Sequence, residues 1–228
     1  GPLSKSVEDA ALLYAALRGQ NAFDLKGSHL RGKRLAVLQT AAFEDLRDAP
    51  RRGFEQALAR LAEAGAVIEK VEIPAVSDAL PLSPILYTCE AYGTWKDVIE
   101  AQPDLMFDEI LKRFRGGAEF TAADYVSAWH TLDALRQSYA EKSAGYDAVL
   151  CPTAPILPPN AQRLLSDENY YVTENLLALR NTRIGNLLGL CAVTLPTGMP
   201  SCGIMLMAAP DQEERLLRLS LASEVALN

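Results

Sequence analysis

The spacing of hydrophobic residues along the first third of the chain predicts a helix and then a strand, a helix and a strand. Apolar residues recur every three or four positions over residues 7–17, which is the period of an amphipathic helix. Residues 34–39 form a short apolar run of strand type, residues 54–65 return to the helical period and end at a glycine, and residues 66–74 alternate as a strand does. The order strand, helix, strand predicts a βαβ unit, so we expect parallel pairing in the sheet.

The middle of the chain predicts helical cover, roughly over residues 77–145. A proline at position 103 and two adjacent glycines at 116–117 divide this stretch, because both residue types interrupt helices. The predicted helices span about 83–101, 104–115 and 121–144.

The last third predicts three more strands and two helices. Residues 147–151 have the pattern of a buried strand and run into a proline-rich loop, and strand ends of this kind face ligand crevices in open α/β sheets. A helix is predicted from about residue 174, with an interruption near Gly185. The remaining elements are strands at 192–196 and 202–210 and a closing helix at 212–227. We therefore predict one α/β domain over residues 1–228, with a mixed, partly parallel sheet covered by helices.

Composition and charge exclude several classes of partner. The 228 residues are 49% hydrophobic and 22% charged, which is typical of a chain that buries a core. The net charge of −7 provides no basic field for nucleic acid or anionic lipid, so we expect neither nucleic acid nor membrane as a partner. No apolar run is long enough to span a bilayer and no signal-peptide pattern opens the chain, so a cytosolic location is expected unless an upstream segment carries an address.

Arrangements that could carry chemistry by themselves are missing from the sequence. Four cysteines without a CxxC pair predict buried, reduced thiols, and two histidines are too few for a multi-histidine zinc site, so no metal is expected. Neither GxSxG nor SxxK occurs, and the GxxxxGK match at 27–33 precedes a strand, which is wrong for a phosphate loop. His29 lies in that loop, whereas His130 lies on a predicted helix in a half-buried packing role. Glu90 lies in an apolar part of a helix and is interpreted as a structural hydrogen-bond centre or, alternatively, as a pocket residue.

A further pattern is carried by four stretches that follow one another over nearly the whole chain. They are "GPLSKSVEDAALLYAAL" at the start, "YDAVLCPTAPILPP" at 146–159, "NTRIGNLLGLCAVTLPTG" at 181–198 and "GIMLMAAPDQEERLLRLSLASE" at 203–224. Together, in this order and at this spacing, they resemble the amidase-signature family of serine amide hydrolases. The chain departs from the family at Cys191-Ala192, where Pro-Ala is usual, and at Met205, where glutamine is common. These departures weaken any transfer of substrate class.

The resemblance covers only the C-terminal half of such an enzyme and fold. The family's triad is a lysine, a serine held through a cis peptide and a nucleophilic serine, and all three lie upstream of the Gly-Pro segment with which this chain begins. No catalytic residue is therefore assigned here, and Lys5 and Ser6 are not equivalents of the triad. In the whole enzyme the resemblance implies a serine that attacks an amide carbonyl, releases ammonia or an amine, and leaves an acyl-enzyme for water to hydrolyse. No cofactor is implied.

The resemblance implies that this half of the enzyme forms part of the wall of the substrate pocket and supports the fold. An arginine can hold a substrate carboxylate through two hydrogen bonds, which suits a small acidic amide. For the two arginines among the candidates the alternative is an ion pair on the helix surface with Glu174 or a similar acid. For the asparagine it is a set of bonds to backbone groups in the turn. The candidate substrate-binding residues are Thr153, Arg180, Thr182, Arg183 and Asn186.

Three functions compete at this point. The first is the C-terminal portion of an amidase, inert alone, whose partners are a small amide substrate and the upstream half of the same protein. The second is a non-catalytic binding or scaffold module of the same fold, and the third is the amidase subunit of a glutamine-dependent amidotransferase. Because the sheet of the family is built from both halves, the 228 residues alone should expose a strand edge and aggregate or form a homodimer.

Overall fold

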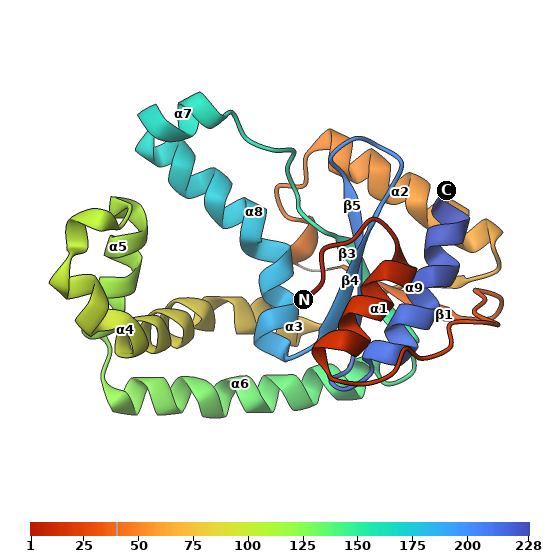
Figure 1. Cartoon of the computed structure of the whole chain (residues 1–228), viewed down its shortest axis with the longest axis horizontal. Coiled ribbons are helices and arrows are strands. Elements are labelled where there is room, and N and C mark those ends of the chain that lie inside the picture. Colours follow the sequence, from red (N-terminus) through yellow and green to blue (C-terminus); the bar gives the residue numbers. More distant parts are fainter. Residues whose placement is uncertain (40) are drawn as a thin grey trace.

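The computed structural model describes residues 1–39 and 41–228, and places one five-stranded sheet between two sets of helices (Figure 1). The strands are β1 (Arg34–Leu38), β2 (Val67–Val71), β3 (Ala148–Pro152), β4 (Cys191–Pro196) and β5 (Gly203–Ala208). The helices are α1 (Val7–Leu17), α2 (Asp48–Glu63), α3 (Pro74–Ala79), α4 (Ser83–Ala101), α5 (Asp108–Arg115), α6 (Ala122–Ser143), α7 (Ala161–Ser166), α8 (Glu168–Leu188) and α9 (Glu213–Leu227). Short 3₁₀ turns lie at Ala41–Phe43, Leu80–Leu82, Pro103–Leu105 and Gly116–Glu119.

The sheet is mixed, as the sequence predicts, and its strand order is β2-β1-β3-β5-β4. β1 pairs in parallel with β2 and with β3, and α2 connects β1 to β2, so the predicted βαβ unit is confirmed. β5 runs antiparallel to β3 and to β4. The short turn between β4 and β5 allows only antiparallel pairing, because a parallel pair needs a long crossover.

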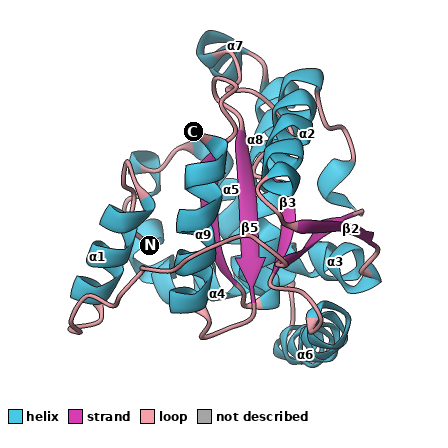
Figure 2. Cartoon of the chain, turned by 90° about the vertical axis from the view of Figure 1, so that its right-hand side faces the viewer, coloured by secondary structure: helices cyan, strands magenta, loops and turns pink. Residues whose placement is uncertain are grey.

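Both faces of the sheet are buried, and β1 shows why its sequence does not alternate. Leu35 and Val37 point into a core that α1, α2 and α9 cover, whereas Ala36 and Leu38 point into a second core under α3, α6 and α8. A strand in the middle of a sheet with helices on both faces needs apolar residues at every position. Figure 2 shows the two helical layers on either side of the sheet.

The helices α4 and α5 form a lobe that projects away from the sheet in Figure 1. α4 occupies the span predicted for the first helix of the middle region, and α6 begins at a capping box in which Thr121 and Asp124 exchange hydrogen bonds with each other's backbone N–H. Nowhere in the part of the chain that the structure describes is a helix both long enough and apolar enough to cross a membrane.

Several helices differ from the prediction. The helix predicted at about 104–115 is a 3₁₀ turn at Pro103–Leu105 followed by α5, which begins only at Asp108. α2 begins at Asp48, six residues before the predicted start at residue 54, since Pro50 is tolerated in a first helical turn. α8 begins at Glu168 because the Asp167 side chain accepts a hydrogen bond from the backbone of Tyr170 and caps it. α8 also continues through Gly185, so the predicted interruption is wrong. The short helices α3 and α7 carry too few residues to show a period, and the sequence does not predict them.

The free edge of β4 leads to a prediction about the purified chain. β5 is the neighbour of β4 within the described residues, and Ala192, Thr194 and Pro196 of β4 are exposed. On α1, the side chains of Leu13 and Leu17 are 45% and 75% exposed. We expect the 228-residue chain, purified alone, to self-associate at micromolar concentration through these surfaces, because unpaired strand edges and apolar patches drive association. Light scattering at several concentrations measures this, and a constant mass of 24.8 kDa with a cooperative thermal transition would refute it.

Candidate functional site

The carboxyl ends of β1 and β3 lie side by side at one edge of the sheet, because these strands are parallel neighbours. The loops that leave them are tied together by a hydrogen bond of 2.9 Å from the backbone N–H of Arg47 to the carbonyl of Pro155. α8 contributes side chains to both loops from one face of the sheet. Ligands in open α/β sheets bind beyond the carboxyl ends of the strands, so this edge is the candidate site.

Thr153 follows β3 and faces the turn between β4 and β5. Its backbone N–H donates to the carbonyl of Gly203 at 2.9 Å, and its Oγ1 lies 3.3 Å from Oγ1 of Thr194. A Cβ at position 203 would lie 2.7 Å from Thr153 Oγ1, so only glycine allows this close approach. Thr153 lines an open depression of about 640 Å³ together with Ser4 and the turn at 194–203.

Arg180 lies on the other side of β3, towards β1. Its Nη2 donates to the carbonyl of Ala42 at 3.2 Å, and its Nε donates to Oδ1 of Asn181 at 3.1 Å. Burial lowers the pKa of the guanidinium, and the nearby acids Glu44 and Asp45 partly offset this. Thr153 thus contacts β4 and β5, whereas Arg180 contacts the loop after β1, although both are predicted from the sequence to line one pocket wall.

Arg183 is the second candidate arginine, one helical turn further along α8. Burial lowers the pKa of its guanidinium; the nearby Tyr87 partly offsets this, and the charge of Arg113 lowers the pKa slightly further. No hydrogen bond or ion pair of the Arg183 side chain is found among residues 1–39 and 41–228. The surface ion pair with Glu174 is therefore wrong for Arg183, and its half-buried cation faces the helical lobe without a carboxylate partner in the described part of the chain.

The remaining two candidates on α8 face their own helix or solvent. Thr182 Oγ1 donates to the carbonyl of Leu179, in the same turn of α8. Asn186 is exposed, and the turn that ends α8 is closed by backbone bonds and by Gly189, whose φ is +69°. The expectation that the Asn186 side chain binds this turn is wrong, because a glycine in the left-handed region satisfies the helix end without it.

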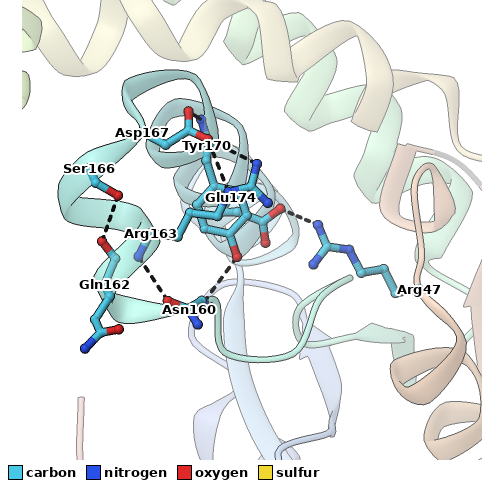
Figure 3. Close-up of polar contacts among 8 residues, drawn as sticks. All are labelled: Arg47, Asn160, Gln162, Arg163, Ser166, Asp167, Tyr170 and Glu174. Atoms are coloured by element: carbon cyan, nitrogen blue, oxygen red, sulfur yellow. Dashed lines mark hydrogen bonds and ion pairs between the residues drawn. The ribbon is translucent and has the colours of Figure 1, made fainter.

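Two polar residues that are not among the substrate-binding candidates join α8 to the segment that follows β1 and to the end of β3. Asn181 is fully buried, and its Nδ2 donates to the carbonyls of Ala42 (3.1 Å) and Pro152 (2.7 Å). Glu174 is 2% exposed and is bound by Arg47, the residue that leads into α2 (Figure 3). Glu174 is thus a buried carboxylate. The alternative ion pair between Arg180 and Glu174 is therefore wrong, because Glu174 pairs with Arg47.

Figure 3 also shows how the segment before α8 is held on that helix. The backbone N–H of Asn160 donates to the Tyr170 hydroxyl at 3.1 Å, and the Arg163 guanidinium lies 4.1 Å from the Tyr170 ring centroid while pairing with Asp167. These contacts keep the loop after β3 close to Glu174. The loop therefore has a defined position beside the candidate site.

Other polar residues singled out in the sequence lie elsewhere. Glu90 is exposed on α4, so the prediction of a buried hydrogen-bond centre there is wrong; that face of α4 is turned to solvent. His130 is exposed on α6 and is not half-buried.

The four thiols are free as predicted, but only Cys151 and Cys202 are buried. Burial raises the pKa of Cys151 to about 12, which leaves it an uncharged thiol. Throughout the described ranges, His, Cys, Asp and Glu side chains do not gather in a group of three that could hold a metal ion.

Comparisons with known proteins give a consistent picture. The family model described as Amidase matches residues 1–217. The chain is 27% identical to 2-amino-5-chloromuconic acid deaminase of Comamonas testosteroni, covering 100% of this chain and 51% of that protein. It is 24% identical to a glutamyl-tRNA(Gln) amidotransferase subunit of Sulfurisphaera tokodaii, covering 100% and 55%. A crystal structure of an amidase superimposes with a TM-score of 0.79 at 23% identity, over 100% of this chain and 52% of the other, and shows that the fold is shared. The chain spans about half the length of the curated relatives it matches.

Proposed function

Because the chain belongs to the Amidase family, we propose that it is the C-terminal part of an enzyme that hydrolyses the C–N bond of a small amide in the cytosol. The observation that carries this proposal is the family match over residues 1–217. In addition, the whole chain aligns with only about half the length of a relative such as the deaminase. In this proposal the upstream half supplies the nucleophilic serine, the second serine and the lysine, and the present chain supplies part of the pocket wall.

The reaction follows from those roles. The lysine takes the proton of the nucleophilic serine through the second serine, and the serine oxygen attacks the amide carbonyl. The C–N bond breaks as the proton passes to the leaving nitrogen, so ammonia or an amine departs and an acyl-enzyme remains. Water then hydrolyses the acyl-enzyme to the free acid.

The arginines of α8 support an acidic substrate. Arg180 and Arg183 are both half-buried, and neither pairs with a carboxylate within the described residues. A guanidinium that is partly removed from water binds a carboxylate more strongly than an exposed one does. We therefore include both in the proposed site, with Thr153, Thr182 and Asn186 as further candidates.

The experiment uses the full-length protein and measures ammonia release from succinamate, which carries a carboxylate, and from butyramide, which does not. We expect turnover of both, with the higher kcat/KM for succinamate. If neither amide is hydrolysed, the chain is better described as a binding or scaffold module of the same fold.

Arg183 is expected to contribute to the affinity for succinamate. Replacing it by alanine should raise KM for succinamate by about tenfold or more, because a hydrogen bond to a charged group contributes roughly 1.5–3 kcal/mol. Arg218→Ala on α9 is the control, since Arg218 pairs with Glu214 on the opposite face of the sheet. An unchanged KM in Arg183→Ala would remove Arg183 from the site.

A second candidate function is supported by the relatives that are named as subunits of glutamyl-tRNA(Gln) amidotransferase. In that case the full-length protein would release ammonia from glutamine and would be purified with a stable partner protein. Glutamine in the same ammonia assay, together with the mass of the native complex, separates the two functions.

A further inference from the structure

The guanidinium of Arg180 is held by one of its two edges. The Nε and Nη2 hydrogens that lie on the same side of the planar group donate to Asn181 Oδ1 at 3.1 Å and to the Ala42 carbonyl at 3.2 Å. The Nη1 and Nη2 hydrogens at the end of the group have no protein acceptor within the described residues. A carboxylate binds this end edge through two parallel hydrogen bonds.

Asn181 makes this arrangement rigid. The side chain is fully buried and uses both of its N–H groups, one on Ala42 and one on Pro152, while its oxygen accepts from Arg180. The amide can form all these bonds in only one orientation. If its oxygen and nitrogen were exchanged, the NH2 group would face the N–H donors of Arg180 and the oxygen would face the two carbonyl oxygens, so none of the bonds could form. Asn181 therefore connects the loop after β1, the end of β3 and the guanidinium in one network.

The charges around Arg180 are few. Glu44 and Asp45, on the loop after β1, are the acidic residues whose charges act on it, and neither forms an ion pair with it in the part of the chain that the structure describes. The guanidinium is half-buried, so its charge is less screened than that of a surface arginine. A group that is already fixed also loses less conformational entropy when it binds an anion.

We propose that Asn181 is a positioning residue, which fixes Arg180 so that the free Nη1 and Nη2 edge binds the carboxylate of an acidic amide. This inference rests on the proposed function and adds the residue that orients the carboxylate-binding group. Asn181 itself touches Arg180 and the backbone and not the substrate. Its effect on catalysis is therefore predicted to depend on Arg180 and on the charge of the substrate.

The test measures kcat and KM of the full-length protein for succinamate and butyramide in Asn181→Ala, Arg180→Lys and the double variant. Each single variant should raise KM for succinamate about tenfold, while kcat/KM for butyramide changes less than about threefold, because a lysine or an unfixed arginine cannot present the planar fork. The double variant should lose no more selectivity than Arg180→Lys alone, since Asn181 acts through Arg180. Ser223→Ala is the matched control, because Ser223 is a buried polar residue of α9 bonded to the carbonyl of Leu219.

Several results would overturn the inference. An equal loss of kcat/KM for both amides in Asn181→Ala would mean a purely structural role, and additive losses in the double variant would mean that Asn181 does not act through Arg180. If Asn181→Ala does not fold, Arg180→Lys still decides, because an unchanged preference for succinamate in that variant contradicts the inference. If the wild type hydrolyses butyramide as well as succinamate, the inference fails while the proposed hydrolase stands. If the wild type hydrolyses neither, the proposed function itself fails.

Discussion

The 228-residue chain purified by itself is expected to release no ammonia from succinamate above the rate of the buffer, whereas the full-length protein turns it over. Both histidines, His29 and His130, are exposed and form no hydrogen bond within the described residues, and Cys151 is buried as a neutral thiol. Removing the nucleophile of a serine hydrolase lowers kcat by roughly 10⁶. The loss should therefore be complete at ordinary enzyme concentrations.

The control for this experiment is reconstitution. The upstream segment is expressed separately and mixed with the chain, and activity that appears only in the mixture supports a divided site. Ammonia release by the isolated chain at a rate comparable with that of the full-length protein would contradict the proposal, because it would place a complete set of catalytic groups within these residues.

Replacing Arg47 by alanine should give the largest loss of stability among single changes at the candidate site. The side chain of its partner Glu174 is 3% exposed, so the variant leaves a buried carboxylate without its cation. Breaking a fully buried pair costs about 3–5 kcal/mol, and because the Arg47 side chain is 47% exposed we expect the free energy of unfolding to fall by about 2–3 kcal/mol. Urea denaturation of the full-length protein measures the change.

Arg115→Ala is the matched control for this prediction. The Arg115 side chain is 45% exposed, close to the value for Arg47, but its partner Glu100 is 38% exposed and keeps its contact with water. The midpoint of unfolding should therefore change far less than in Arg47→Ala. Equal shifts in the two variants would show that the burial of Glu174 is not what makes its ion pair important.

The sequence pattern predicts most of the elements and the parallel βαβ unit, but not the order of the strands in the sheet. β1 and β3 are each recognisable as short apolar runs, since central strands of a covered sheet are apolar at every position. The strand order could not be predicted, because β3 inserts between β1 and β5 after a long helical excursion that carries no pairing signal. The extra turns at the start of α8 depend on the cap at Asp167, which precedes the apolar period.

The candidate site was only partly predictable for a similar reason. Arg180 and Arg183 could be named because arginine is suited to carboxylates, whatever surrounds it. The buried role of Asn181 could not be predicted, and Glu174 was predicted only as a surface ion-pair partner of the arginines. Polar side chains are usually exposed, and the true partners are distant in the sequence: Asn181 binds Ala42, 139 residues away, and Glu174 binds Arg47, 127 residues away. Such contacts are set by the tertiary fold and leave no local pattern.

The central claim is that this chain belongs to an amide hydrolase whose nucleophilic serine lies outside residues 1–228. The most direct measurement is to treat the native full-length protein with a fluorophosphonate, which reacts with activated serines, and to locate the modified residue by peptide mass spectrometry. We predict a single adduct on a serine outside these 228 residues, with loss of amide hydrolysis in proportion to labelling. An adduct on a serine within the 228 residues, or full hydrolysis without any adduct, would contradict the claim.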